Sequence, residues 1–130
     1  MKAYVLTEEG PRILDVPPGT PGPHELLVRV RAAALNRADL YMVKGMVHGS
    51  HGGVGQILGG DWAGEVAALG EGVEGFRIGD RVMGAGFGSF AQFNVVAAAR
   101  ALGTLVRIWV SEAAAPWAVA TRLGTRSARR

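Results

Sequence analysis

Glycine and proline divide this chain into short segments. Five of its six prolines precede residue 24, and fifteen of its twenty glycines lie between Gly45 and Gly88. Both residues favour turns and interrupt helices, so their spacing predicts many short strands and few, short helices. With 130 residues the chain has room for one domain, whose folding would bury about two-thirds of the unfolded surface. We therefore expect a single, mainly β domain.

The strands are predicted from alternation of apolar and polar residues. In the clearest pattern, Val28, Val30 and Ala32 alternate with Arg29 and Arg31. A strand places successive side chains on opposite faces, so the three apolar residues are expected on a buried face and the arginines in water. The predicted strands cover residues 1–7, 13–16, 25–33, 63–69, 90–96 and 102–110.

One more strand is predicted from a turn, and the strand at 90–96 shows an alternation of its own. Gly79 and Asp80 predict a tight turn that feeds a strand starting at residue 81, because glycine tolerates positive φ and aspartate hydrogen-bonds to nearby backbone. In the strand at 90–96, Phe93 and Val95 alternate with Asn94, which predicts a half-buried strand with its apolar residues inward.

A short helix is predicted after the strand at 25–33. Asn36 is suited to its N-cap, Asp39 lies in its first turn, and Lys44 followed by Gly45 is a suitable end. The glycine-rich residues 46–56 are expected to form a mobile loop. A second short helix is predicted over residues 117–123, with Pro116 at its first position and Gly124 beyond its end.

Composition excludes several classes of protein. The chain has no cysteine, which rules out disulfides and thiolate metal sites and suits a cytoplasmic protein. No apolar run approaches the ~20 residues that span a bilayer, and no signal peptide is expected. Residues 101–130 hold 5 basic and 1 acidic residue, against 9 and 10 in residues 1–100. Because this excess lies on a chain end, Arg122 to Arg130 are expected to be solvated, and nucleic-acid binding is not expected.

The stretch from Gln56 to Val82 resembles the motifs of the medium-chain dehydrogenase/reductase superfamily. The matching residues are Gly59, Asp61, Ala63, Gly64, Val66, Gly70, Gly72, Val73, Phe76, Gly79, Asp80, Arg81 and Val82. The resemblance extends from Met1 to about Ala97 and implies a GroES-like, partly open β-barrel with short helices. It implies that residues 1–97 form this domain and that residues 98–130 are a divergent tail, truncated before the cofactor domain.

The resemblance also bears on metal binding. In zinc-dependent members of the superfamily, Cys stands at the position of Asn36, and His-Glu at Gly60-Asp61. Neither Asn nor Gly is a good zinc ligand, so no zinc is expected. His48 and His51 lie three residues apart and could be imagined as a metal pair near Asp61, but they lack a third ligand and fit a solvated loop.

Asn36, Asp39 and Tyr41 resemble the corresponding segment of the zinc-free quinone oxidoreductases. This resemblance implies hydride transfer from NADPH to a quinone or an enone. It implies that Asn36 hydrogen-bonds near the nicotinamide ribose, that Tyr41 contacts cofactor and substrate, and that Asp39 belongs to the catalytic group. Gly60 and Asp61 would then line the substrate pocket. The protein would chiefly position the reactants and exclude water.

The same three residues also have an explanation without catalysis. Asn36 as a helix cap, Asp39 as a partner of the helix dipole and Tyr41 as a half-buried aromatic account for the spacing. Both interpretations remain open at the level of sequence.

A dinucleotide site is not evident from the sequence. No G-x-G-x-x-G turn connects a predicted strand to a predicted helix, so no complete Rossmann domain is expected. We therefore expect little activity from this chain alone and a separate dinucleotide-binding chain as a partner. The alternative is a non-enzymatic interaction module, or a β-domain that self-associates into a homo-oligomer through an uncovered edge.

Overall fold

A computed structural model describes residues 1–47 and 52–103 of the chain. In order, the elements are β1 (Lys2–Thr7), β2 (Gly10–Asp15), β3 (Glu25–Ala34), α1 (Arg37–Val43), β4 (Asp61–Leu69), β5 (Arg81–Ala85), β6 (Phe93–Ala97), the 3-10 helix η1 (Ala98–Arg100) and β7 (Ala101–Gly103). The prediction of a mainly β domain with short helices is confirmed.

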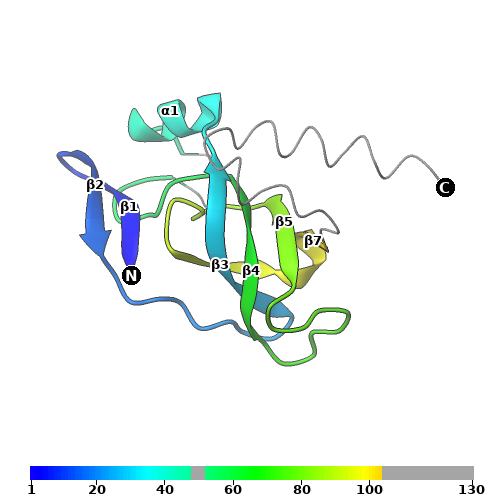
Figure 1. The fold of residues 1–130 in the computed structure, drawn as a ribbon. Coiled ribbons are helices and arrows are strands. Elements are labelled where there is room, and N and C mark those ends of the chain that lie inside the picture. The colour runs from blue at the N-terminus through cyan, green and yellow to red at the C-terminus, as the bar shows by residue number, and fades with distance from the viewer. Residues whose placement is uncertain (48–51, 104–130) are drawn as a thin grey trace, which may run out of the picture.

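The strands form two open sheets (Figure 1). β1 and β2 make a two-stranded hairpin, and the other five strands follow the order β6-β3-β4-β5-β7. Every pairing between these strands is antiparallel. The described part of the chain therefore contains open sheets and no closed barrel, as expected for a partly open GroES-like domain.

One face of the five-stranded sheet forms the main core. Its buried members are Leu26, Val28, Trp62, Val66, Val82, Val96 and Ala101. A second cluster, made of Leu6, Met42 and Leu58, joins β1 and α1 to the segment before β4. Burial of an apolar side chain of this size stabilises a fold by about 1.5–3 kcal/mol, so the two clusters fix the hairpin and the helix against the sheet.

The predicted alternation along β3 is confirmed only for its first half. Val28 is fully buried, and Arg29 and Arg31 are exposed. A register shift between Val30 and Ala32 leaves the Arg31 backbone without an opposing residue on β4, so that Ala32 pairs with Ala63. An extra residue of this kind is a β-bulge, and it reverses the phase of the strand. Ala32 therefore leaves the core face to which the sequence assigned it.

The predicted faces of β6 are wrong. Asn94 and Val96 are the buried residues, and Phe93 lies on the opposite, half-buried face. Pairing with β3 determines this outcome, because Asn94 lies opposite Val28 and Val96 opposite Leu26. Partners on neighbouring strands share a face of the sheet, so β6 must follow the core face of β3.

Local contacts accommodate this reversal. The buried Asn94 side chain donates a hydrogen bond from Nδ2 to the Phe87 carbonyl at 3.1 Å. A buried amide without a partner would be costly, so this contact explains how a polar residue is tolerated inside. On the outer face, the Arg29 guanidinium lies 5.4 Å from the centre of the Phe93 ring, within the range of a cation–π interaction.

The predicted turn before β5 is confirmed. Gly79 has φ +90°, and its N–H donates to the Val66 carbonyl at 2.8 Å. The Asp80 carboxylate accepts from the Arg77 N–H at 2.8 Å, as expected for an aspartate that stabilises its own turn. The turn thus returns the chain to pair β5 with β4.

Some predicted elements lie outside the described residues. The strand predicted at 102–110 is described only as far as Gly103, at the end of β7. The helix predicted at 117–123, the tail beyond residue 103, and His48 and His51 lie outside the described ranges. The predicted mobile loop at 46–56 falls partly outside them as well.

The close approach of β3 and β4 provides a test of the fold. A Cβ at Gly64 would lie 2.2 Å from the Arg29 carbonyl oxygen and 2.7 Å from Val28 Cγ1. We therefore expect Gly64→Ala to lower the free energy of unfolding by about 1–3 kcal/mol, measured by urea denaturation. Gly103→Ala is the matched control, because a Cβ at this strand glycine meets no atom within 4 Å. Equal stability of the two variants would contradict the β3–β4 packing described above.

Candidate functional site

The candidate site lies where β3 ends, β4 begins and α1 starts. Ala34, the last residue of β3, pairs with Asp61, the first residue of β4. Asn36 follows two residues later as the N-cap of α1, with φ −119° and ψ 156°. Figure 1 shows α1 at this end of the sheet. Strand pairing and helix initiation therefore bring Asn36 and Asp61 together although they are 25 residues apart in sequence.

Asn36 is the centre of a small hydrogen-bonded group. Its backbone N–H donates to Asp39 Oδ2 at 2.7 Å, and its side-chain Nδ2 donates to Asp61 Oδ2 at 2.8 Å. Both distances are those of well-formed hydrogen bonds, and an ionised acceptor makes such bonds stronger than neutral ones. The site thus links the first turn of the helix to the first residue of β4.

Asp39 has a structural position within this group. Only 7% of its surface is exposed, and together with Asn36 it forms a capping box at the start of α1. A carboxylate in the first turn also interacts favourably with the helix dipole. Asp39 therefore fixes the helix start, as the interpretation without catalysis requires, and leaves little of its own surface for a ligand.

Gly60 leaves space next to the Asn36 amide. Among the residues that the structure describes, a Cβ built at Gly60 would have one neighbour within 4 Å, the Asn36 Nδ2 atom at 4.0 Å. Its backbone φ lies outside the left-handed region, so glycine is not required there by conformation. Gly60 therefore contributes open space beside the Asn36 side-chain amide.

Tyr41 lies outside the hydrogen-bonded group. It is 44% exposed, whereas the adjacent Met42 is buried against Leu6 and Leu58. Met42 therefore anchors α1 on the second core cluster while Tyr41 presents its ring to the surface. Leu40 and Val43 of the same helix are also exposed. The structure thus groups Asn36, Asp39, Gly60 and Asp61, and places Tyr41 on the open side of the adjoining helix.

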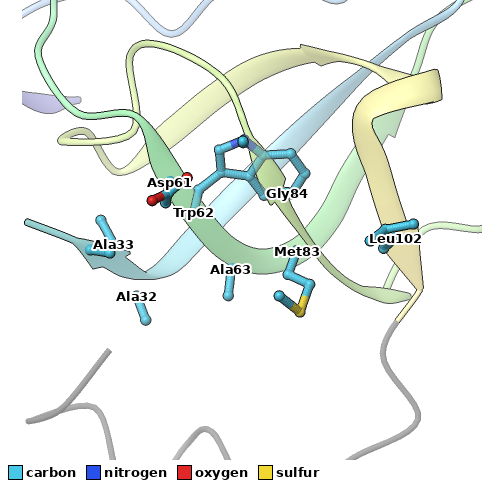
Figure 2. Close-up of a pocket in the computed structure, with 10 residues that line it drawn as sticks. Ala32, Ala33, Asp61, Trp62, Ala63, Met83, Gly84 and Leu102 are labelled. Atoms are coloured by element: carbon cyan, nitrogen blue, oxygen red, sulfur yellow. The ribbon is translucent and has the colours of Figure 1, made fainter. Parts of the chain in front are cut away.

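A shallow apolar pocket adjoins Asp61, and the sequence did not predict it. Its volume is about 310 Å³. It is lined by Ala32, Ala33, Ala34, Asp61, Trp62, Ala63, Met83, Gly84, Ala85 and Leu102. In Figure 2, Ala32, Ala63 and Met83 point to one side of the sheet and the Trp62 ring to the other. The pocket thus occupies the face opposite the main core.

The register of the strands produces this pocket. Ala32 pairs with Ala63, Ala63 with Met83, and Met83 with Leu102, so these side chains form one row across four strands. Leu102 is 67% exposed at the end of the row. The small residues at 32–34 were the available sequence signal. Alternation alone placed Ala32 in the core, because the bulge at Arg31 is not visible in the sequence pattern.

Metal-ligand groups and membrane-spanning helices are both absent from the described residues. Across residues 1–47 and 52–103, no three or more His, Cys, Asp or Glu side chains are grouped as metal ligands. Within the same ranges, no helix has the length and apolar character needed to cross a membrane. The only helix there longer than three residues is α1, which has seven.

Comparison with known proteins finds similarity to an alcohol dehydrogenase GroES-like domain and to a quinone oxidoreductase. Residues 22–106 match the family described as the alcohol dehydrogenase GroES-like domain. A quinone oxidoreductase of Pseudomonas aeruginosa is 40% identical over 93 residues, which are 68% of this chain and 28% of that protein. The crystal structure of human synaptic vesicle membrane protein VAT-1 homolog-like protein gives a TM-score of 0.78 at 31% identity, covering 88% of this chain and 38% of that chain.

A further solved structure is that of mycobacterial Rv1454c complexed with NADPH. It gives a TM-score of 0.75 at 29% identity and covers 88% of this chain and 37% of that chain. Across these three proteins, the present chain spans 28% to 38% of their length.

The role of Asp39 at the helix start can be tested directly. We expect Asp39→Ala to lower the free energy of unfolding by about 1–2 kcal/mol, because it removes the acceptor of the Asn36 N–H. Asp39→Asn keeps an acceptor oxygen and is expected to recover part of the loss. Glu74→Ala, at an exposed position outside the helices and strands, is the control and should change stability by less than about 0.5 kcal/mol. If Asp39→Ala behaves like this control in urea denaturation, the capping role is wrong.

Proposed function

The chain belongs to the family of alcohol dehydrogenase GroES-like domains, within the medium-chain dehydrogenase/reductase superfamily, and we propose that it is the substrate-side domain of a quinone oxidoreductase-like enzyme. Its reaction is hydride transfer from NADPH to a quinone or an enone. The domain comprises residues 1–97, and residues 98–130 form a divergent tail. β7, which belongs to this tail, pairs with β5 of the domain.

One observation carries the proposal. The Asn36 amide is held at the end of β3 by Asp61, with open space beside it at Gly60. An ordered amide next to an unfilled space is a suitable arrangement for binding a polar ligand group. The quinone oxidoreductase of Pseudomonas aeruginosa and the NADPH complex of Rv1454c support the choice of ligand.

Each residue of the site has its own role in the proposed reaction. Asn36 contacts the nicotinamide end of the cofactor, Tyr41 donates its O–H to the carbonyl of the acceptor, and Gly60 and Asp61 form the wall of the substrate cleft. Asp39 contributes by holding Asn36 in place at the helix start. Bound NADPH would supply the hydride, and the chain's own residues would orient the reactants and exclude water.

The donor set fits a zinc-free site. Asn36 and Gly60 offer no thiolate, imidazole or carboxylate, which are the ligands that zinc prefers. Asp39 Oδ2 accepts a hydrogen bond from the Asn36 backbone N–H, and Asp61 Oδ2 accepts one from the Asn36 side-chain amide. The two carboxylates at the site are therefore engaged in hydrogen bonds.

The cofactor's pyrophosphate needs a second binding unit. In a dinucleotide fold, a glycine-rich turn and a helix N-terminus receive it after a parallel strand. Among residues 1–47 and 52–103, every strand pairing is antiparallel, and α1 follows β3 without such a turn. We place the pyrophosphate and adenosine contacts on a dinucleotide-binding unit outside the described residues, either elsewhere in the protein or on a separate chain.

A second candidate function has its own observation. Leu35, Leu40 and Val43 are exposed around α1, next to Tyr41. An exposed apolar patch is typical of an interaction surface. A non-enzymatic module that binds a partner or a second copy through α1 would use it. Light scattering separates the two functions, because a strict monomer across concentration counts against self-association.

The site assignment predicts where NADPH acts on the chain. Titration of the ¹⁵N-labelled chain with NADPH is expected to shift the Asn36 side-chain amide and the Gly60 backbone amide. Asn36→Ala is expected to weaken binding roughly fivefold, the loss of about one hydrogen bond. The buried Asn94 amide, bonded to the Phe87 carbonyl, is the internal reference and should not move. Shifts confined to the β1–β2 hairpin would contradict the assignment.

Turnover tests the need for a second unit. Mixed with NADPH and a quinone, this chain is expected to oxidise the cofactor only slowly, because the pyrophosphate contacts are missing from the described residues. Cofactor absorbance follows the reaction. Rapid and saturable oxidation by the chain alone would show that no separate dinucleotide-binding unit is required.

A further inference from the structure

We propose that Asp61 is a positioning residue: its carboxylate orients the Asn36 side-chain amide so that one amide N–H remains for an oxygen atom of the ligand. The identity of the ligand rests on the proposed function. The contact between the two side chains does not depend on it. This role differs from lining the substrate cleft, because Asp61 acts through another side chain.

The contact fixes which way the amide faces. The oxygen and nitrogen of an Asn side chain have nearly the same shape, so hydrogen-bond partners decide their assignment. A carboxylate accepts hydrogen bonds and does not donate them, so the atom that faces Asp61 Oδ2 at 2.8 Å must be Nδ2. Asp61 therefore excludes the flipped amide.

Among the ion pairs that the described residues show, none involves Asp61. These ion pairs join Lys2 to Asp15, Arg12 to Glu9 and Arg31 to Glu65. Glu65 lies four residues after Asp61 on β4 and forms an ion pair with Arg31 at 3.0 Å. The arginine of β3 that is nearest to Asp61 in the strand pairing is therefore already engaged. The Asp61 carboxylate instead accepts a hydrogen bond from the Asn36 side-chain amide.

The other end of Asn36 is held by the helix. Its backbone N–H is bonded to Asp39 Oδ2, and the two residues form the capping box of α1. The Asn36 backbone is thus held by α1, and its side-chain amide is held by Asp61 of β4. An Asn amide has two N–H groups, and Asp61 uses one of them.

The remaining N–H defines the chemical class of the ligand atom. A donor requires an acceptor, so Asn36 would bind a carbonyl, hydroxyl or ether oxygen. Within residues 1–47 and 52–103, Gly60 leaves open space next to Nδ2, where such an oxygen could approach. The amide would otherwise be free to turn, and each productive contact would then require ordering a side chain first.

Three variants of the full chain test this role. Asp61→Ala removes the acceptor, Asp61→Asn keeps an acceptor oxygen, and Glu65→Ala removes a carboxylate from the same strand as a control. The first readout is the pair of Asn36 side-chain amide protons in NMR. The amide proton bonded to Asp61 should move upfield in Asp61→Ala and stay close to its native shift in Asp61→Asn and Glu65→Ala.

The second readout is the affinity for NADPH. Asp61→Ala is expected to raise Kd roughly fivefold, whereas Asp61→Asn and Glu65→Ala should stay within about twofold of the native chain. Far-ultraviolet circular dichroism identifies any variant that fails to fold, and Asp61→Asn then still tests the role through its retained amide signature. An Asn36 proton pair that is unchanged in folded Asp61→Ala would overturn the proposal.

The two readouts separate this inference from the proposed function. If NADPH shifts no resonance of the site while the Asn36 protons still depend on Asp61, the cofactor assignment fails and the positioning role stands. If NADPH binds at Asn36 and Asp61→Ala alters neither the proton pair nor Kd, the positioning role fails and the cofactor assignment stands.

Discussion

The antiparallel pairing of β3 with β4 is the constraint on which the rest of the structure depends. It aligns Val28 with Val66 inside the core and Ala34 with Asp61 at the far end of the same two strands. The close approach at Gly64 leaves no room for a side chain between them. Because the pair is the centre of the five-stranded sheet, its register also fixes the faces of β5 and β6.

The candidate site is a consequence of that register. Asn36 follows the end of β3 and lies at the start of α1. Asp61, the first residue of β4, lies beside it. Buried Met42 then holds α1 against Leu6 and Leu58, which keeps the helix from moving away. The site is therefore built from backbone geometry and one hydrophobic anchor, and a few hydrogen bonds complete it.

Local signals in the sequence predicted local features well. The Asn36 cap, the Gly79–Asp80 turn and the strand at 25–33 depend on residues close in sequence, and the structure contains all three. The motif resemblance likewise identified the family. These features need no knowledge of which strands pair.

Features that depend on pairing were not predictable in the same way. Asn94 faces the core because β6 follows β3, and Ala32 leaves the core because Arg31 is bulged. The alternation of residues within one strand does not show whether that strand contains an extra residue. It also does not show which residues of the neighbouring strand face the core. The contact between Asn36 and Asp61, and the pocket of alanines beside it, escaped the sequence pattern for the same reason.

The bulge at Arg31 divides β3 into two parts, one that packs in the core and one that lines the pocket. Val28, before it, packs into the interior, while Ala32 and Ala34, after it, line the outer pocket. Substitutions in the second part can therefore reshape a binding surface without disturbing the packing that the first part supports. A single bulged residue in this way makes recognition and stability separately adjustable along one continuous strand.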